Sequence, residues 1–289
     1  MSRNRGRVGG PKKRGSSPPP AAMKSEQEGS GTAFSFVVPT EFVDLPSKGK
    51  FYAEGHPLHG ESTIEIRHMT AKEEDILTSR ALLKKGVALD RLIKNIIVNK
   101  AIDPTTLLVG DRNAIIIAAR ISGYGEEYET QVTCPACATV QKYQFDLNDA
   151  EVYEGEDKLS AYDISPNDDG TFEITLPRSK AVVIFRLLSG KEEKLMVTGM
   201  ESDRKRKGAE KNITRQLMQL IVSVNGDASQ KMREYLVQNI PSMDSRYLRH
   251  SYDVACPNVD LTQHFECSEC DYSQDMEVPL TADFFWPDR

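Results

Sequence analysis

The sequence predicts an α+β protein with an internal duplication. Two similar halves, each made of helices followed by a β-hairpin, would be joined by a zinc-ribbon-like site of four cysteines. The first observation is that two segments, each with one Cys-x-x-Cys pair, align without a gap, so that Cys134 matches Cys267. The second is that the helical patterns upstream of both pairs also match. The third is a basic N-terminal tail with few large apolar residues, for which we expect disorder.

Each cysteine pair is predicted to lie at the turn of a β-hairpin. Apolar and polar residues alternate on both sides of the pair in "YETQVTCPACATVQKYQFDL" and in "LTQHFECSECDYSQDMEVPL". One such turn presents two thiolates, whereas a tetrahedral structural zinc site needs four. The spacing therefore favours one shared zinc over a separate metal site in each half. Unligated core cysteines and thioredoxin-like redox chemistry are the alternatives. The predicted ligands are Cys134, Cys137, Cys267 and Cys270.

Similarity between the halves extends upstream of the cysteines. Asp111 aligns with Asp244, and each is predicted to be a helix N-cap before an apolar run. "VALDRLIKNIIVN" and "NITRQLMQLIVSVN" each place apolar residues on one helix face, at an offset of 128, and "IRHMTAKEED" resembles "FRLLSGKEEK" at an offset of 119. We interpret this as a duplication of about 62–150 and 175–283, with chance similarity between two α+β segments as the alternative.

Composition divides the chain further. Residues 1–33 hold seven Lys/Arg and two Asp/Glu, a net charge of +5, and since the whole chain has a net charge of −6 the remainder has −11. A basic tail is a solvated segment, a weak nucleic-acid contact or a contact for an acidic partner, and the acidic remainder argues against broad phosphate binding. The predicted organisation is a tail at 1–33, an extended lead-in segment at 34–61, a first half at 62–150, an acidic connector at 151–174 and a second half at 175–289.

Local patterns predict individual elements. Thr70 and Glu73 form a capping-box signature that opens a helix through about Leu83. The segments "TFEITLP" and "KAVVIFRLL" are expected to pair as strands, and helices are expected near 211–224, 229–239 and 244–255.

The sequence also contains a cysteine, histidines and aromatic residues outside the two Cys-x-x-Cys pairs that could be structural or functional. Cys256 and His264 have no counterpart in the first half, so both are expected to be structural, and His56 and His59 are expected to pack within their own turn. The turn that precedes Phe51 and Tyr52 is either an interface loop or a segment pinned to the core. Phe284, Phe285 and Trp286 are expected to be core, with a partner anchor as the alternative.

Motifs for catalysis and for membrane insertion are missing from the sequence. It contains no HExxH, GxxxxGK[ST], GxSxG or strand-borne GxGxxG pattern, and four thiolates would leave a zinc ion no open position for water. We therefore expect no enzymatic activity. No apolar run reaches 18 residues, and the N-terminus lacks the apolar stretch of a signal peptide.

The strings "VVPTEFVDLPSKGKFYAEGHPLHG", "IEIRHMTAKEEDILTSRALLKKG" and "FECSEC" resemble the baseplate hub assembly proteins of T-even-type tailed phages, especially their cyanophage-like relatives. The resemblance covers roughly 35–286 and excludes the basic tail. It implies a hub subunit or hub assembly factor of a contractile-tail baseplate that binds hub and tail proteins. The implied location is the host cytoplasm during assembly, with the virion tail as a second location. The resemblance implies neither catalytic residues nor the zinc site.

Two other classes of function are weighed against the baseplate role. A zinc-ribbon nucleic-acid-binding accessory protein of a phage is favoured by the basic tail and the two cysteine hairpins, and opposed by the acidic remainder. A hydrolase with a diffuse site has no sequence feature in its favour. The sequence does not determine the oligomeric state, the hub subunit that is contacted or the stoichiometry.

Overall fold

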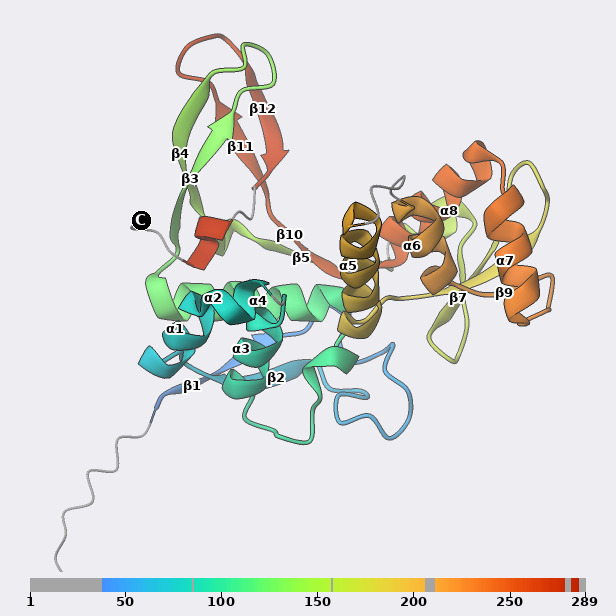
Figure 1. Ribbon diagram of the computed structural model, residues 1–289, viewed down its shortest axis with the longest axis horizontal. Helices are drawn as coiled ribbons and strands as arrows, with labels where there is room; N and C mark the ends of the chain where they lie inside the picture. Colours follow the sequence, from blue (N-terminus) through green and yellow to red (C-terminus); the bar gives the residue numbers. More distant parts are fainter. Residues whose placement is uncertain (1–37, 85, 157, 206–210, 279–281, 286–289) are drawn as a thin grey trace, which may run out of the picture. The chain divides into compact units, whose positions relative to one another are not determined.

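The computed structural model describes residues 38–84, 86–156, 158–205, 211–278 and 282–285 (Figure 1). The predicted tail at 1–33 lies outside the described residues. Helices and strands are mixed along the chain, as expected for an α+β protein. None of the described helices combines the length and apolar character needed to cross a bilayer. The helices are α1 Ala71–Thr78, α2 Arg80–Lys84, α3 Ala88–Ile96, α4 Val109–Tyr124, α5 Gly190–Lys205, α6 Asn212–Leu220, α7 Gln230–Asn239 and α8 Ser242–Ala255, with 3-10 turns η1 Pro104–Thr106, η2 Leu147–Asp149, η3 Ser160–Tyr162 and η4 Ala282–Phe285.

All strand pairs named here are antiparallel, and they form small sheets rather than one large one. β1 pairs with β2, β3 with β4, β5 with β10 and β11 with β12, while β6, β7, β8 and β9 form a four-stranded sheet in that order. The strands are β1 Thr40–Asp44, β2 Thr63–Arg67, β3 Glu127–Thr133, β4 Val140–Asp146, β5 Glu151–Tyr153, β6 Ser165–Pro166, β7 Thr171–Thr175, β8 Val182–Arg186, β9 Ile221–Val224, β10 Asn258–Asp260, β11 Thr262–Glu266 and β12 Ser273–Glu277.

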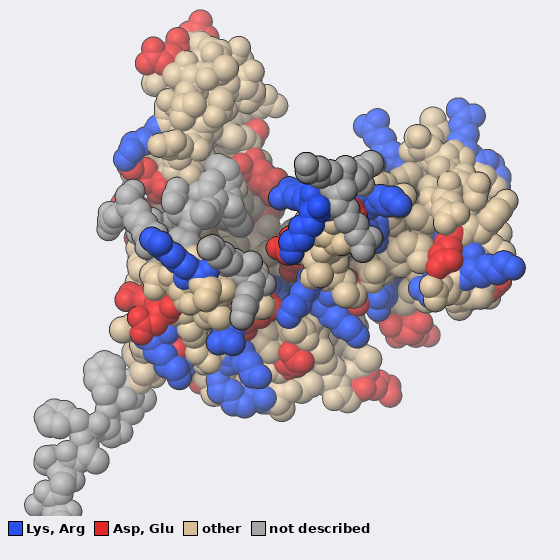
Figure 2. All heavy atoms as spheres, viewed as in Figure 1, with Lys and Arg blue, Asp and Glu red and all other residues tan. Residues whose placement is uncertain are grey.

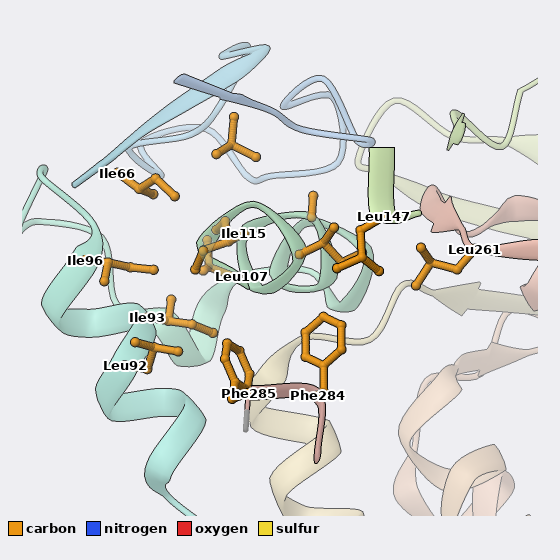
Figure 3. Close-up of a cluster of buried hydrophobic side chains, with 14 of the residues drawn as sticks. Ile66, Leu92, Ile93, Ile96, Leu107, Ile115, Leu147, Leu261, Phe284 and Phe285 are labelled. Carbon is orange, nitrogen blue, oxygen red and sulfur yellow. The ribbon is translucent and has the colours of Figure 1, made fainter. Parts of the chain in front are cut away.

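The first hydrophobic core surrounds α4. Ile115 of α4 is packed with Ile93 of α3 and Ile66 of β2 (Figure 3). The same core contains Leu261, Phe284 and other residues from the C-terminal end of the chain. Segments more than 150 positions apart therefore bury one continuous apolar surface, which is the main stabilising term of a fold. The second hairpin and η4 pack with the first half of the chain.

The second core lies between the four-stranded sheet and helices α6, α7 and α8. Phe172 of β7 stacks on Phe185 of β8, and both side chains are fully buried. Leu217 of α6 and Leu248 of α8 complete the cluster from the helical side. Phe51 reaches this core from the segment after β1, with its ring centroid 5.5 Å from that of Phe172.

Two carboxylates are held in the same way at the starts of α1 and α5. At α1, Thr70 and Glu73 form the predicted capping box, and Arg67 binds the Glu73 carboxylate at 2.6 Å. Burial by itself would raise the pKa of Glu73, but hydrogen bonds from Arg67 and Thr70 lower it to about 2. At α5, Glu192 accepts hydrogen bonds from the backbone and hydroxyl of Ser189 and from Arg186.

Three local expectations are wrong. The capping box opens a helix that ends at Thr78, because Ser79 adopts an extended conformation and α2 follows as a separate helix. The helix expected at 211–224 ends at Leu220, and the β-branched run after it is strand β9, which pairs with β8. Asp111 and Asp244 are not N-caps. Each is the third residue of its helix and accepts hydrogen bonds from a distant loop instead of its own helix.

Candidate metal centre

The two hairpins place the four cysteines beside one another. Cys134 follows β3 and Cys267 follows β11, so each begins the turn of its hairpin. The backbone N–H of Cys134 donates to the carbonyl of Thr139 at 2.9 Å, and that of Cys267 donates to the carbonyl of Tyr272, also at 2.9 Å. The same hydrogen bond thus shapes both turns. It turns the chain back so that the second cysteine of each pair faces the first.

The sulfur geometry matches a tetrahedral four-thiolate site. Sγ of Cys134 lies 3.8 Å from Sγ of Cys270, and Sγ of Cys137 lies 3.7 Å from Sγ of Cys267. All four sulfurs lie within 4.8 Å of one another, and none forms a disulfide. Zn–S bonds of about 2.3 Å in a tetrahedron require sulfurs about 3.8 Å apart. Both short distances join one hairpin to the other, so the four sulfurs form a single cluster and not two pairs.

Polar contacts hold the hairpins together next to the sulfurs. The side-chain amide of Gln141 donates to the carbonyl of Glu266 at 3.1 Å and accepts from the backbone N–H of Ser268 at 3.0 Å. Tyr143 donates its hydroxyl to the carbonyl of His264 at 3.1 Å, and its ring packs on Phe265 with centroids 5.0 Å apart. These contacts fix the relative position of the two turns by means that do not involve the cysteines.

Cys137 and Cys270 differ in the pKa of their thiols. Cys134 is 1% exposed, whereas Cys137 is exposed. Hydrogen bonds with the side chain and backbone of Thr139 lower the pKa of Cys137 to about 6. At Cys270 a backbone hydrogen bond with Tyr272 opposes burial and the neighbouring sulfurs, and these last two raise the pKa to about 12. A metal ion that recruits all four thiolates must therefore displace protons.

The remaining cysteine and the histidines have other partners. Cys256 contacts the hydroxyl of Tyr252 at 3.6 Å, and burial raises the pKa of its thiol to about 11. His264 contacts Asp275 at 3.0 Å. His56 contacts the hydroxyl of Thr106, and His59 contacts a carbonyl in the preceding turn. Within the residues that the structure describes, the metal-competent group is the four cysteines.

The turn before Phe51 and Tyr52 belongs to the core, so an interface role for Tyr52 is wrong. Tyr52 is 6% exposed, and its hydroxyl donates to the Asp111 carboxylate at 2.7 Å. Asp111 also accepts from the backbone N–H of Ser47 at 3.0 Å and from its hydroxyl at 2.6 Å. Burial raises the pKa of Asp111, against the effect of these hydrogen bonds. Sequence patterns did not reveal this anchor, because its partners lie about 60 residues away.

The C-terminal aromatic residues are also core. Phe284 and Phe285 are 4% and 5% exposed, as expected, while Trp286 lies outside the described residues. The carbonyl of Phe284 accepts a hydrogen bond from Arg120, an arginine with no exposed surface near the C-terminal end of α4. A charged residue within the apolar run "AIIIAARI" is the one sequence signal that could have drawn attention to Arg120.

The comparisons with known proteins give one family. No curated protein and no solved structure matches the chain. A family model described as T4 bacteriophage base plate protein matches residues 38–286, which includes both hairpins and both cores. This range covers most of the chain and leaves out the basic tail. The chain therefore belongs to the T4 bacteriophage base plate protein family.

Proposed function

We propose that this baseplate protein is a hub component or hub assembly factor that acts by binding other tail proteins and catalyses no reaction. The family match carries the proposal, because it extends over both cores and both hairpins. A closed cluster of four thiolates supports a structural role, since a catalytic zinc keeps a coordination position open. The proposed locations are the host cytoplasm during assembly and the virion tail afterwards.

Loss of the gene product from an infecting phage tests this role. Without the protein, tails should lack a complete baseplate hub, and a plasmid copy should restore them. Mass spectrometry of purified virions against lysate separates the two versions of the proposal, because a hub component stays in the virion and an assembly factor does not. Intact hubs in the absence of the protein would refute both versions.

We further propose that the four cysteines bind one structural zinc ion per chain. The sulfur separations and the junction between two hairpins support this assignment. Elemental analysis should give one equivalent of zinc, and two equivalents would contradict a shared site. Cys134→Ser and Cys267→Ser should lower the melting temperature equally, since each removes one ligand of the same metal. Cys256→Ser is the matched control, because that cysteine lies outside the cluster.

The proposed internal duplication has support in the packing. The predicted halves, 62–150 and 175–289, with a connector at 151–174 between them, each contain one held carboxylate at a helix start and one aspartate that ties a loop to a later helix. These matched features favour copies that begin earlier than the sequence suggested, at β1 and at β7. The matched residues are Arg67, Thr70, Glu73 and Asp111 in the first copy and Arg186, Ser189, Glu192 and Asp244 in the second.

The alternative role in nucleic-acid binding is opposed by the charge of the hairpins. Residues 126–146 and 262–277 hold nine Asp/Glu and one lysine. A surface of that sign repels a phosphate backbone, and affinity for nucleic acid depends on Lys and Arg that neutralise phosphates. We therefore expect no salt-dependent retention on DNA by residues 34–289, and retention by that fragment would favour the alternative.

A further inference from the structure

The β1–β2 sheet and the four-stranded sheet β6–β7–β8–β9 differ at one edge. In the second half, β7 is paired on both sides, by β8 and by β6. In the first half, β1 is paired with β2 on one side, and the described residues provide no strand for its other side. The comparison rests on the proposed duplication, in which β1 corresponds to β7 and β2 to β8. Strand pairing fixes this alignment. Ile66 of β2 bridges to Ile97, the residue after α3, and Phe185 of β8 pairs in the same way with Ile221, the residue after α6.

The backbone of β1 presents hydrogen-bonding groups along this edge. The N–H of Leu45 donates to Ser62, and the carbonyl of Pro39 accepts from His68, so alternate residues between them face β2. The N–H and C=O groups of Thr40, Phe42 and Asp44 therefore point away from β2. All three residues are exposed, and Phe42 is 72% exposed. An exposed edge with an aromatic residue at its centre is a template for pairing with another strand.

The equivalent edge in the second half is occupied. Glu173 of β7 corresponds to Phe42 and is paired with Ser165 of β6. β6 precedes β7, and the chain turns back between them through a turn that ends at Gly170, whose φ of +77° suits glycine. Before β1, the carbonyl of Pro39 is instead bonded to His68, so the chain continues along β2 at this point. Among the described residues, none that precedes β1 pairs with its free edge as β6 pairs with β7.

We propose that β1 pairs with β1 of a second copy of this chain, in an antiparallel arrangement centred on Phe42. This register is self-complementary, as a two-fold interface requires. Phe42 lies opposite Phe42 of the second copy, and Thr40 lies opposite Asp44, whose carboxylate can accept a hydrogen bond from the threonine hydroxyl. Glu41 lies opposite Val43, so no like charges face each other directly. The product is a continuous sheet of four strands, the number found in the second half.

The test is sedimentation velocity on the full chain over a concentration series, because a contact made by one pair of short strands belongs to the weak class of interfaces. The wild type should show a monomer–dimer equilibrium. Phe42→Glu, which installs the residue type of the second half, should raise the dimer dissociation constant at least about tenfold by removing the aromatic pair and placing like charges opposite each other. Phe42→Pro should act similarly, since it deletes an N–H that points away from β2.

Tyr235→Glu is the matched control, because Tyr235 is 66% exposed on α7, away from β1. All three variants should melt close to the wild type. A wild type that stays monomeric overturns the proposal and leaves the edge to another baseplate protein or to the chain's own preceding residues. A dimer that survives both Phe42 variants overturns it as well. Neither outcome bears on the role in the hub, which is tested in infected cells.

Discussion

Replacing Arg120 by methionine should destabilise the protein severely, because this buried arginine joins three separate parts of the first core. Its guanidinium donates to the carbonyl of Phe284 at 2.6 Å, of Gly125 at 2.6 Å and of Glu127 at 3.0 Å. The carbon at the centre of the guanidinium also lies 5.5 Å from the centroid of the Tyr124 ring. One buried cation thus ties the end of α4, the start of β3 and the C-terminal turn η4 together.

The magnitude follows from the three acceptors. Hydrogen bonds to a charged group contribute about 1.5–3 kcal/mol each. Methionine has a similar length and avoids the cost of burying a charge, so it recovers part of this sum. The carbonyl of Phe284 stays buried without its donor, while those of Gly125 and Glu127 are only partly buried, and we expect a net loss of about 3–5 kcal/mol in the free energy of unfolding. For a domain of this size that corresponds to a melting temperature lower by roughly 10 °C.

The assay is a melting curve together with limited proteolysis. Arg120→Met should also speed cleavage near Phe284, because the C-terminal turn loses its hydrogen bond to α4. Arg246→Met is the control, since Arg246 is an exposed arginine on α8 and its loss should change the melting temperature little. A variant at Arg120 that melts with the wild type would show that the three carbonyls find other donors, and the reasoning from buried hydrogen bonds would fail.

Three further predictions concern other parts of the chain. Glu73→Gln and Glu192→Gln should each destabilise the protein at neutral pH. Because the pKa of Glu73 is about 2 in the folded state, its stabilisation is present above about pH 4.5 and is lost as the pH falls toward 2, so the Glu73 variant should show a flatter acid dependence in urea titrations. Tyr52→Phe should lower the free energy of unfolding by about 1–3 kcal/mol, because Asp111 stays buried with one donor fewer, and an unchanged urea midpoint would contradict this. Deleting residues 1–33 should leave the melting temperature unchanged by calorimetry, since a segment so poor in apolar residues adds little to a core.

The hairpins and the cysteine cluster could be predicted from the sequence because their signals are local. A period of two residues identifies a strand, and a Cys-x-x-Cys pair between two such strands identifies a turn that presents two sulfurs. The meeting of Cys134 with Cys270 and of Cys137 with Cys267 needed one more step, the inference that two similar hairpins lie together. The structure confirms that the four sulfurs form one cluster.

The features that sequence patterns did not predict depend on partners far along the chain. Asp111 and Asp244 are of a residue type that is common at helix N-caps. Their carboxylates instead accept hydrogen bonds from Ser47 and from the loop at Arg178. The sequence pattern predicts that the helix continues through the residues of β9, because an apolar run fits a helix face as well as a buried strand. The pairing of β9 with β8 decides between the two conformations. The sequence leaves Tyr52 open between an interface and the core for the same reason, since its acceptor on Asp111 is a tertiary partner.

The position of the cysteine cluster implies that a bound metal would stabilise the fold beyond the two hairpins. Cys137 and Cys267 are separated by 130 positions, and their sulfurs lie 3.7 Å apart. A cross-link that closes a loop of this length removes chain entropy from the unfolded state that is equivalent to about 5 kcal/mol. Two separate sites, each within one hairpin, would close very short loops and remove far less. Because Phe265 and Phe284 join the first core from beyond the connector, the same cross-link would also hold the C-terminal segment on that core. A shared metal would therefore stabilise the packing of the C-terminal segment on the first core, which the polar contacts between the hairpins would otherwise have to maintain.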